Sequence, residues 1–405
     1  MTAGRSASRW AIALAGAVSL AVAMGIGRFA FTPLLPMMLH DGVVDLRDAS
    51  WLASANYLGY LAGALLCTFQ PWIWARIGGL PPINPIALLR GGLVATGLLT
   101  LAMALPWPAA WPLWRFAAGV ASAVVFVYTS GWCLGRLAQM NQAALGGAIY
   151  SGPGAGIVVS GVFASGMVQW GWTARAGWIV FGALAFALTA SVWRTFSGGP
   201  AAATAAATPV GPGAPNVHGA AEIASLALGY GLAGFGYIVT ATFLPVIARQ
   251  ALPGAPWLDL FWPVFGLGVM IGALLATRLR MTLDMRLLLA AGHVVQAIGI
   301  AIGILSPTLA GFAIGSLLLG IPFTAITFFG IHEIRRLRPQ QAASFMGLMT
   351  ALYGLGQIAG PPMVALVLHH SASTGAGFTL ALEIAAGGLL LGTAIYLLMR
   401  VRWPR

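Results

Sequence analysis

The sequence predicts an all-α integral membrane protein with twelve transmembrane helices in two pseudo-symmetric six-helix bundles. Three observations predict this class: an apolar composition, twelve apolar stretches near spanning length, and one internal repeat. Of the 405 residues, 59% are hydrophobic and 7% are charged, whereas a soluble protein has about 25% charged residues. So few charges cannot cover a surface that faces water, so lipid must be the main solvent of this chain.

The apolar stretches supply the helices. A spanning helix needs roughly 20 predominantly apolar residues, and each stretch is close to that length. The first begins like a signal peptide, with basic residues before an apolar run, but the run continues past Met24, so we expect it to be retained as the first helix. The stretches are 10–36, 51–70, 87–106, 111–133, 143–166, 175–195, 222–247, 258–277, 287–305, 309–331, 343–368 and 376–399.

The arginines predict the orientation. The chain has no lysine, and its formal net charge of +12 comes from arginine. With a cytoplasmic N-terminus, fifteen arginines fall on the cytoplasmic side and four on the other side, which follows the positive-inside rule. We therefore expect a multi-pass protein of the bacterial inner membrane with both termini cytoplasmic. The positive charge then faces lipid headgroups and indicates no nucleic-acid partner.

An internal repeat joins the two halves of the sequence. The stretch GIGRFAFTPLLP (25–36) aligns without gaps on GFGYIVTATFLP (234–245), at an offset of 209 residues. The same offset aligns GYLAGALL (59–66) with GVMIGALL (268–275). Both halves begin on the same side of the membrane, so they are parallel repeats, which place a substrate site between the halves near the bilayer midplane.

A segment rich in Ala, Pro and Gly separates the halves, and this composition predicts a flexible cytoplasmic linker. The predicted organisation is an N-terminal six-helix bundle at 1–196, a linker at 197–220 and a C-terminal six-helix bundle at 221–405.

Four stretches resemble a known family. They are MGIGRFAFTPLLPMM (24–38), ANYLGYLAGALL (55–66), YSGPGAG (150–156) and GLMTALYGLGQIAGPP (347–362). Together with the architecture, they resemble the YbfB/YjiJ-type transporters of the major facilitator superfamily. The resemblance implies a major facilitator fold and a secondary transporter, symporter or antiporter, that moves a small solute by alternating access. It does not identify the solute.

The sequence patterns of the major facilitator superfamily match this chain only in part. RFAAGVASA (115–123) is similar to the fourth-helix pattern, in which an arginine precedes small residues, and GPGAG (152–156) is similar to the Gly-Pro element of helix five. The loop after the second helix normally carries an acidic residue. Here it keeps Gly63 and Arg76 but has no Asp or Glu, which puts the gating role of that acid in doubt.

Arg28 is the first candidate site residue. It lies about 18 residues into the first helix, roughly 27 Å along the axis and beyond the midplane. Arginine keeps its charge at any ordinary pH, and a charge at this depth is costly unless it faces a wet cavity or a partner. Gly25 and Gly27 before it, with Pro33 and Pro36 after it, predict a bent or locally open helix.

Two interpretations of Arg28 remain open. It is either a structural anchor that bonds helix carbonyls or snorkels outward, or a cation that binds an anionic substrate. The apolar runs of the N-terminal half contain no acidic residue, so a ligand carboxylate or phosphate is a suitable partner. The repeat pairs Arg28 with Tyr237, and we expect both to face the cavity.

The other substrate-binding candidates are polar or aromatic side chains within apolar runs. Such side chains turn toward a partner helix or a cavity, and packing is as good an explanation as substrate contact. Tyr353 and Gln357 are four residues apart and share a helix face. The remaining candidates are Phe31, Asn56, Tyr57 and Tyr237.

Glycine and proline residues are candidates for hinges, and titratable residues for ion coupling. The coupling candidates are Arg115, His293 and Glu383, the last two because either could titrate with transport. The hinge candidates are Gly25, Gly27, Gly152, Pro153, Gly154, Gly356, Gly360 and Pro361.

Several functions are excluded or left as alternatives. Without lysine the chain cannot form a Walker A loop, and the dinucleotide-like pattern at 229–234 lacks a preceding strand. We find no catalytic cluster, metal motif or cofactor motif, so we expect no enzyme. One alternative is a proton-coupled exporter of amphipathic compounds, contacted by Phe31, Tyr128 and Trp262. Another is a non-transporting membrane receptor or scaffold. The expected partners are a small molecule, membrane lipid and protons, and the expected oligomeric state is a monomer.

Overall fold

The computed structural model describes residues 8–77, 84–196, 219–255, 257–278, 283–338 and 342–404. Within these ranges every regular element is a helix, and twelve helical spans are long and apolar enough to cross a membrane. Each span coincides with one of the twelve apolar stretches, so the predicted fold class is confirmed.

The spans are built from helices that often join end to end. In the first half they are α1 (Arg9–Leu20), the π-helix η1 (Ala21–Ile26), α2 (Phe31–His40), α3 (Leu46–Ile77), α4 (Pro85–Ala102), η2 (Pro108–Ala110), α5 (Trp111–Gln139), η3 (Ala143–Ser151), α6 (Gly152–Gln169) and α7 (Ala174–Val192). In the second half they are α8 (Ala220–Ala251), η4 (Leu258–Leu260), α9 (Phe261–Ala276), α10 (Met285–Leu305), α11 (Leu309–Leu337), α12 (Ala342–His370) and α13 (Thr374–Arg402).

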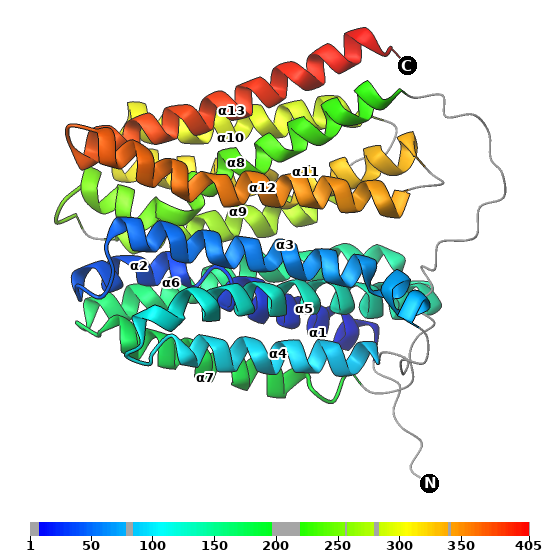
Figure 1. Cartoon of the computed structure of the whole chain (residues 1–405), viewed down its shortest axis with the longest axis horizontal. Helices are drawn as coiled ribbons and strands as arrows, with labels where there is room; N and C mark the ends of the chain where they lie inside the picture. The colour runs from blue at the N-terminus through cyan, green and yellow to red at the C-terminus, as the bar shows by residue number, and fades with distance from the viewer. Residues whose placement is uncertain are drawn as a thin grey trace.

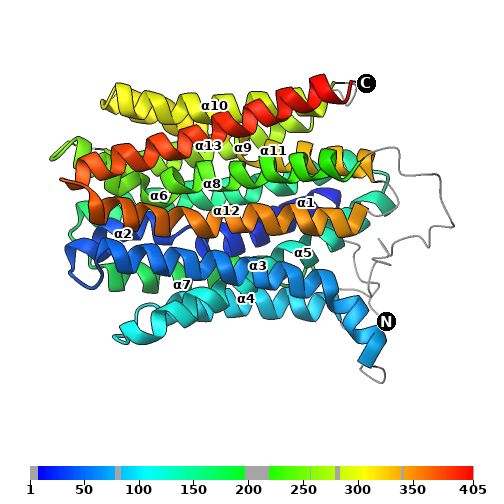
Figure 2. The same cartoon turned by 45° about the horizontal axis from the view of Figure 1, so that its top comes forward.

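The helices lie side by side in two groups, α1 to α7 and α8 to α13 (Figures 1 and 2). The groups meet where α3 packs on α12, α6 on α9 and α2 on α8. Both ends of the described chain lie at one end of the bundle, on the right in Figure 1. We call this end the terminal side and the other end the distal side. The predicted linker falls on 197–218, outside the described residues, so the division at 197–220 and the flexibility of the linker stay predictions.

Close contacts at equivalent glycines show that the internal repeat of the sequence is also present in the packing of the helices. Gly59 and Gly63 of α3 lie against the backbone of α5, so close that neither position has room for a Cβ atom. Gly268 and Gly272 of α9, each 209 residues further on, lie in the same way against the backbone of α11. Small residues permit such close approach of membrane helices, and the offset seen in the sequence therefore describes equivalent helix pairs.

The first span is interrupted as the sequence predicts. The amides of Gly27 and Phe29 bond to the carbonyls of Val22 and Met24, five residues earlier, at 2.9 and 3.0 Å, which is the π-helical pattern. Residues 27–30 form turns before α2 begins, and Pro33 has no amide hydrogen for an α-helical bond. The equivalent span, α8, is one continuous helix through its own glycines and Pro245.

The first span and α8 are more deeply buried toward the distal side than toward the terminal side. Residues 19–38 of the first span and 236–248 of α8 are all buried. Toward the terminal side the same spans have exposed faces, with Leu14 65% and Leu228 54% exposed. The two halves therefore enclose these spans on the distal side and leave them more open on the terminal side.

Candidate functional site

Arg28 lies in the break of the first span and is 3% exposed. Its Nη2 donates a hydrogen bond of 2.5 Å to Oε1 of Gln357 on α12. The Nε2 of Gln357 donates in turn to the hydroxyl of Tyr237 on α8. A guanidinium can only donate, which fixes the amide with its oxygen toward Arg28. One chain of polar contacts therefore joins the two halves, and it links the repeat partners Arg28 and Tyr237 that the sequence expected at the cavity.

Within the described ranges, the only side chain that accepts a hydrogen bond from Arg28 is the neutral Gln357. All eight acidic residues of the sequence lie within these ranges, and the ion pairs found there include none to Arg28. Its Nε hydrogen is also without a partner there. The site therefore holds a buried cation whose compensation comes from an amide dipole and from aromatic rings.

Aromatic rings surround the guanidinium. Its Cζ lies 4.1 Å from the ring centroid of Tyr60, 5.2 Å from that of Tyr57 and 5.4 Å from that of Phe29, within the range of cation–π attraction. The ring of Tyr353 stacks on that of Tyr237 with centroids 5.9 Å apart. Tyr60 and Tyr353 are half-buried and lie on the terminal side of Arg28 along their helices.

Three hydrogen bonds close the distal side of the site, and each crosses from the first half to the second. We call them the distal ties, and in all three a hydroxyl group takes part. They are Thr32 Oγ1 to the carbonyl of Ala241 at 3.0 Å, Tyr57 hydroxyl with Thr242 Oγ1 at 2.9 Å, and Ser54 Oγ to the carbonyl of Ile358 at 3.1 Å.

Arg115, a coupling candidate, supports the break. It is 2% exposed, and its Nη1 and Nη2 donate to the carbonyls of Gly27 and Arg28 at 3.3 and 3.2 Å. These carbonyls lie in the turns where helical pairing is lost. Asn56 donates to the carbonyl of Arg115 at 2.9 Å, which ties α3 to α5. In this structure Arg115 and Asn56 therefore position Arg28, and the coupling role of Arg115 stays a prediction.

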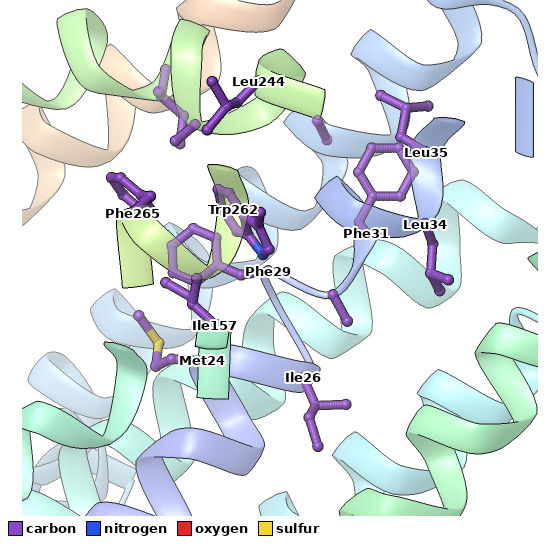
Figure 3. Packing of buried hydrophobic residues seen from close by; sticks show 14 of the residues in the cluster. Met24, Ile26, Phe29, Phe31, Leu34, Leu35, Ile157, Leu244, Trp262 and Phe265 are labelled. Carbon is purple, nitrogen blue, oxygen red and sulfur yellow. The ribbon is translucent and has the colours of Figure 1, made fainter. Parts of the chain in front are cut away.

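Among the described residues, the rings in contact with the Arg28 guanidinium do not include those of Phe31 and Trp262, whose contacts with the solute stay predictions. Figure 3 shows Phe31 beside Leu34 and Leu35, and its ring lies 4.8 Å from the Cζ of Arg115. Trp262 lies against Phe29 (Figure 3), with ring centroids 6.1 Å apart.

The two titratable coupling candidates lie in the second half. His293 of α10 is fully buried, and its ring nitrogens lie 2.8 Å from the carbonyl oxygen of Leu289 and 3.1 Å from that of Gly229. Glu383 lies on an exposed face of α13. Their coupling roles stay predictions.

The hinge candidates lie mainly where helices approach closely. A Cβ at Gly25 would overlap the backbone of Gly156, and one at Gly152 would overlap that of Ala17. Whether these positions bend during transport stays a prediction. Added Cβ atoms at the other glycines would meet Thr96 (at Gly27), Gly266 and Met270 (at Gly154), Gly231 (at Gly356) and Ile238 (at Gly360). Pro153 lies in the first turn of α6 and Pro361 inside α12.

The sequence reasoning missed Tyr60, the ring nearest to Arg28, and the hydroxyl groups of Thr32, Ser54 and Thr242. A signal for Tyr60 was present, because it follows Tyr57 by three residues and therefore shares its helix face. Among the described residues, no group of three or more His, Cys, Asp and Glu side chains could hold a metal ion.

Twelve spans in two groups, with a buried polar site between them, define a membrane transport protein of the major facilitator type. The family model described as "Uncharacterised MFS-type transporter YbfB" matches residues 20–397, and the chain belongs to this family. No curated protein matches the sequence.

Solved structures of the nucleoside transporter NupG share the fold. A mutant form has a TM-score of 0.72 at 14% identity, covering 96% of this chain and 99% of that chain. A second NupG structure has a TM-score of 0.69 at 13% identity, covering 96% and 98%.

Proposed function

We propose that the protein is a secondary active transporter that moves a small organic anion across the bacterial inner membrane by alternating access. The observation that carries this proposal is Arg28, a buried cation at the interface of the halves whose side-chain hydrogen-bond partner is the neutral Gln357. An anion would supply the missing charge, and Arg–carboxylate pairs are strong and well oriented. This is the functional interpretation of Arg28 rather than the structural-anchor one.

The geometry supports access from the terminal side. The distal ties hold the halves together beyond Arg28, whereas Tyr60 and Tyr353 are half-buried on its terminal side. The arginine bias supports a cytoplasmic terminal side, and in that proposed orientation the distal ties would close the site to the outside. Opening to the outside would require the distal ties and the Arg28–Gln357 bond to break. A proton gradient is the proposed driving force and a monomer the proposed unit.

A nucleoside is the second candidate solute. The amide of Gln357 and the rings of Tyr237 and Tyr353 are groups that can pair with a base edge and stack on its face. The fold likeness to the nucleoside transporter NupG is consistent with this candidate. A nucleoside, however, would leave the charge of Arg28 without a counter-charge, so we favour the anion.

The test is solute uptake into proteoliposomes with the full-length chain. We would compare a panel of organic acids, a panel of nucleosides and a panel of amphipathic dyes, for the wild type and for Arg28→Lys and Arg28→Gln. We expect saturable flux of an organic acid that Arg28→Gln abolishes and Arg28→Lys reduces at least tenfold, because lysine cannot bind a carboxylate with two parallel hydrogen bonds. Flux of nucleosides or dyes without flux of acids would refute the proposal, as would normal acid affinity in Arg28→Lys.

A further inference from the structure

The environment of Arg28 limits the kind of anion that it can hold. We propose that the carried solute is a monocarboxylate with a flat, aromatic body, and that its carboxylate takes the place of the Gln357 amide oxygen on Arg28. This inference rests on the proposed function, because it assumes an anion at Arg28. To the proposed function, the inference adds the charge of the solute, the shape of the solute body and the internal group that the solute must displace.

One carboxylate is what Arg28 can bind without disturbing the rest of the site. The second guanidinium next to Arg28 belongs to Arg115, and its two terminal nitrogens already donate to the carbonyls of Gly27 and Arg28. Both arginines retain an Nε hydrogen without a partner among the described residues, but only Arg28 has a side-chain partner, Gln357, that a carboxylate can replace. A second carboxylate would have to draw Arg115 away from the carbonyls of Gly27 and Arg28, which would leave those buried carbonyls without their donor and is costly.

In the structure, the amide of Gln357 occupies the position that we propose for the solute carboxylate. Its Oε1 accepts from Arg28 at 2.5 Å, while its Nε2 is held by the hydroxyl of Tyr237. A carboxylate binds a guanidinium more strongly than an amide oxygen does, so an anion can replace it. A neutral solute offers no such gain and would have to compete with an internal hydrogen bond of similar strength.

The body of the solute would lie among flat rings. Tyr60 places its ring face 4.1 Å from the Cζ of Arg28, and Tyr353 stacks on Tyr237 beside Gln357. Both Tyr60 and Tyr353 are on the terminal side of Arg28, whereas the distal ties occupy its other side. A solute that reaches Arg28 from the terminal side therefore passes between aromatic faces, which favour a planar ring by roughly two- to tenfold in affinity.

The test measures binding to the purified full-length protein by isothermal titration calorimetry. The four probes are benzoate, cyclohexanecarboxylate, benzyl alcohol and phthalate, so that shape and charge vary separately. We expect benzoate to bind, cyclohexanecarboxylate to bind roughly two- to tenfold more weakly, and benzyl alcohol and phthalate to bind at least tenfold more weakly. Phthalate or benzyl alcohol binding as tightly as benzoate would overturn the inference, and so would equal affinity for the two monocarboxylates.

A variant pair tests the displacement of Gln357. Gln357→Glu places a permanent carboxylate beside Arg28, so benzoate affinity should fall at least tenfold. Gln169→Glu, at an exposed position at the end of α6, introduces the same charge far from the site and should leave the affinity unchanged. Unchanged benzoate affinity in a folded Gln357→Glu protein would overturn the displacement step.

The outcomes also separate this inference from the proposed function. If aliphatic acids bind and are carried in a manner that depends on Arg28, but no aromatic preference is found, organic-anion transport stands and this inference fails. If no organic acid binds to the wild type and nucleosides are carried instead, both fail.

Discussion

Thr32 donates a hydrogen bond to the carbonyl of Ala241, and these two residues occupy the same position in the two halves of the repeat. They are 209 residues apart in the sequence, and Oγ1 of Thr32 lies 3.0 Å from the carbonyl oxygen of Ala241. A residue that meets its own repeat equivalent must lie close to the pseudo-twofold axis that relates the halves. The neighbouring pair Arg28 and Tyr237 has the same spacing and meets through Gln357, so the candidate site also lies close to this axis.

The distal ties should set how often the distal side opens. Changing Tyr57→Phe together with Thr242→Val removes one tie with little change in shape, and a typical hydrogen bond contributes about 1 kcal/mol. We therefore expect the population open on the distal side to rise roughly fivefold. The distance between spin labels at Val43→Cys and Leu305→Cys, both exposed distal residues, should show a second and longer population.

The labelled protein needs a background without its own cysteines, since Cys67 and Cys133 are free. Labels at the same two positions with Tyr57 and Thr242 intact provide the control. An identical distance distribution in the two proteins would show that the tie does not hold the distal side closed.

Arg115→Leu should destabilise the protein and weaken solute binding together. The substitution leaves the carbonyls of Gly27 and Arg28 without their donor, and each unsatisfied buried group costs about 1–3 kcal/mol. We expect a lower melting temperature in detergent and at least a tenfold loss of affinity for the solute, because Arg28 loses its support. A melting temperature equal to that of the wild type would contradict this account of Arg115.

Gly25→Ala should be far more harmful than Gly91→Ala, although both add one methyl group to a helical span. A Cβ at Gly25 would overlap the backbone of Gly156, whereas Gly91 has open space around it. In an open helical position alanine is better than glycine by up to about 1 kcal/mol. The yield of monodisperse protein and its melting temperature should fall for Gly25→Ala and hold or rise for Gly91→Ala. Equal behaviour of the two variants would argue against the close packing of the first span on α6.

Glu383→Gln should leave solute affinity within about twofold of the wild type, because Glu383 lies on an exposed face of α13 and not at the interface of the halves. Calorimetry with the identified solute measures this, and Gln357→Glu serves as the variant that should respond. A large loss of affinity in Glu383→Gln would place this carboxylate in communication with the site and would favour it as a coupling residue.

Much of the fold was predictable because it depends on properties that single residues carry. Length and apolarity define the twelve spans, and the identical glycines at 59 and 268 show the repeat without any structural knowledge. The break at Arg28 was also predictable, because glycines at 25 and 27 and proline at 33 act on the backbone locally. The π-helical form of the break was not, since it depends on hydrogen bonds that Arg115 and Ser122 of α5 donate to carbonyls of the first span.

The site was predictable only in part. Arg28, Tyr57, Tyr237, Tyr353 and Gln357 were expected there because polar side chains in apolar spans need partners, and the structure brings these five together. Phe31 was a candidate for substrate contact; its ring lies next to Arg115, and its contact with the solute stays a prediction. The hydroxyl residues of the distal ties gave no signal, since a threonine or serine in a membrane helix usually bonds its own helix.

The neutral partner of Arg28 has a consequence for energetics across a polarised membrane. An empty site that carries a full positive charge must move that charge through part of the electric field whenever the protein reorients, and a whole elementary charge crossing the membrane changes energy by about 2.3 kcal/mol per 100 mV. A bound monoanion would cancel the charge of Arg28, so the loaded protein would move one charge fewer when it reorients. The membrane potential would therefore act more strongly on the return of the empty carrier than on the step that carries the solute.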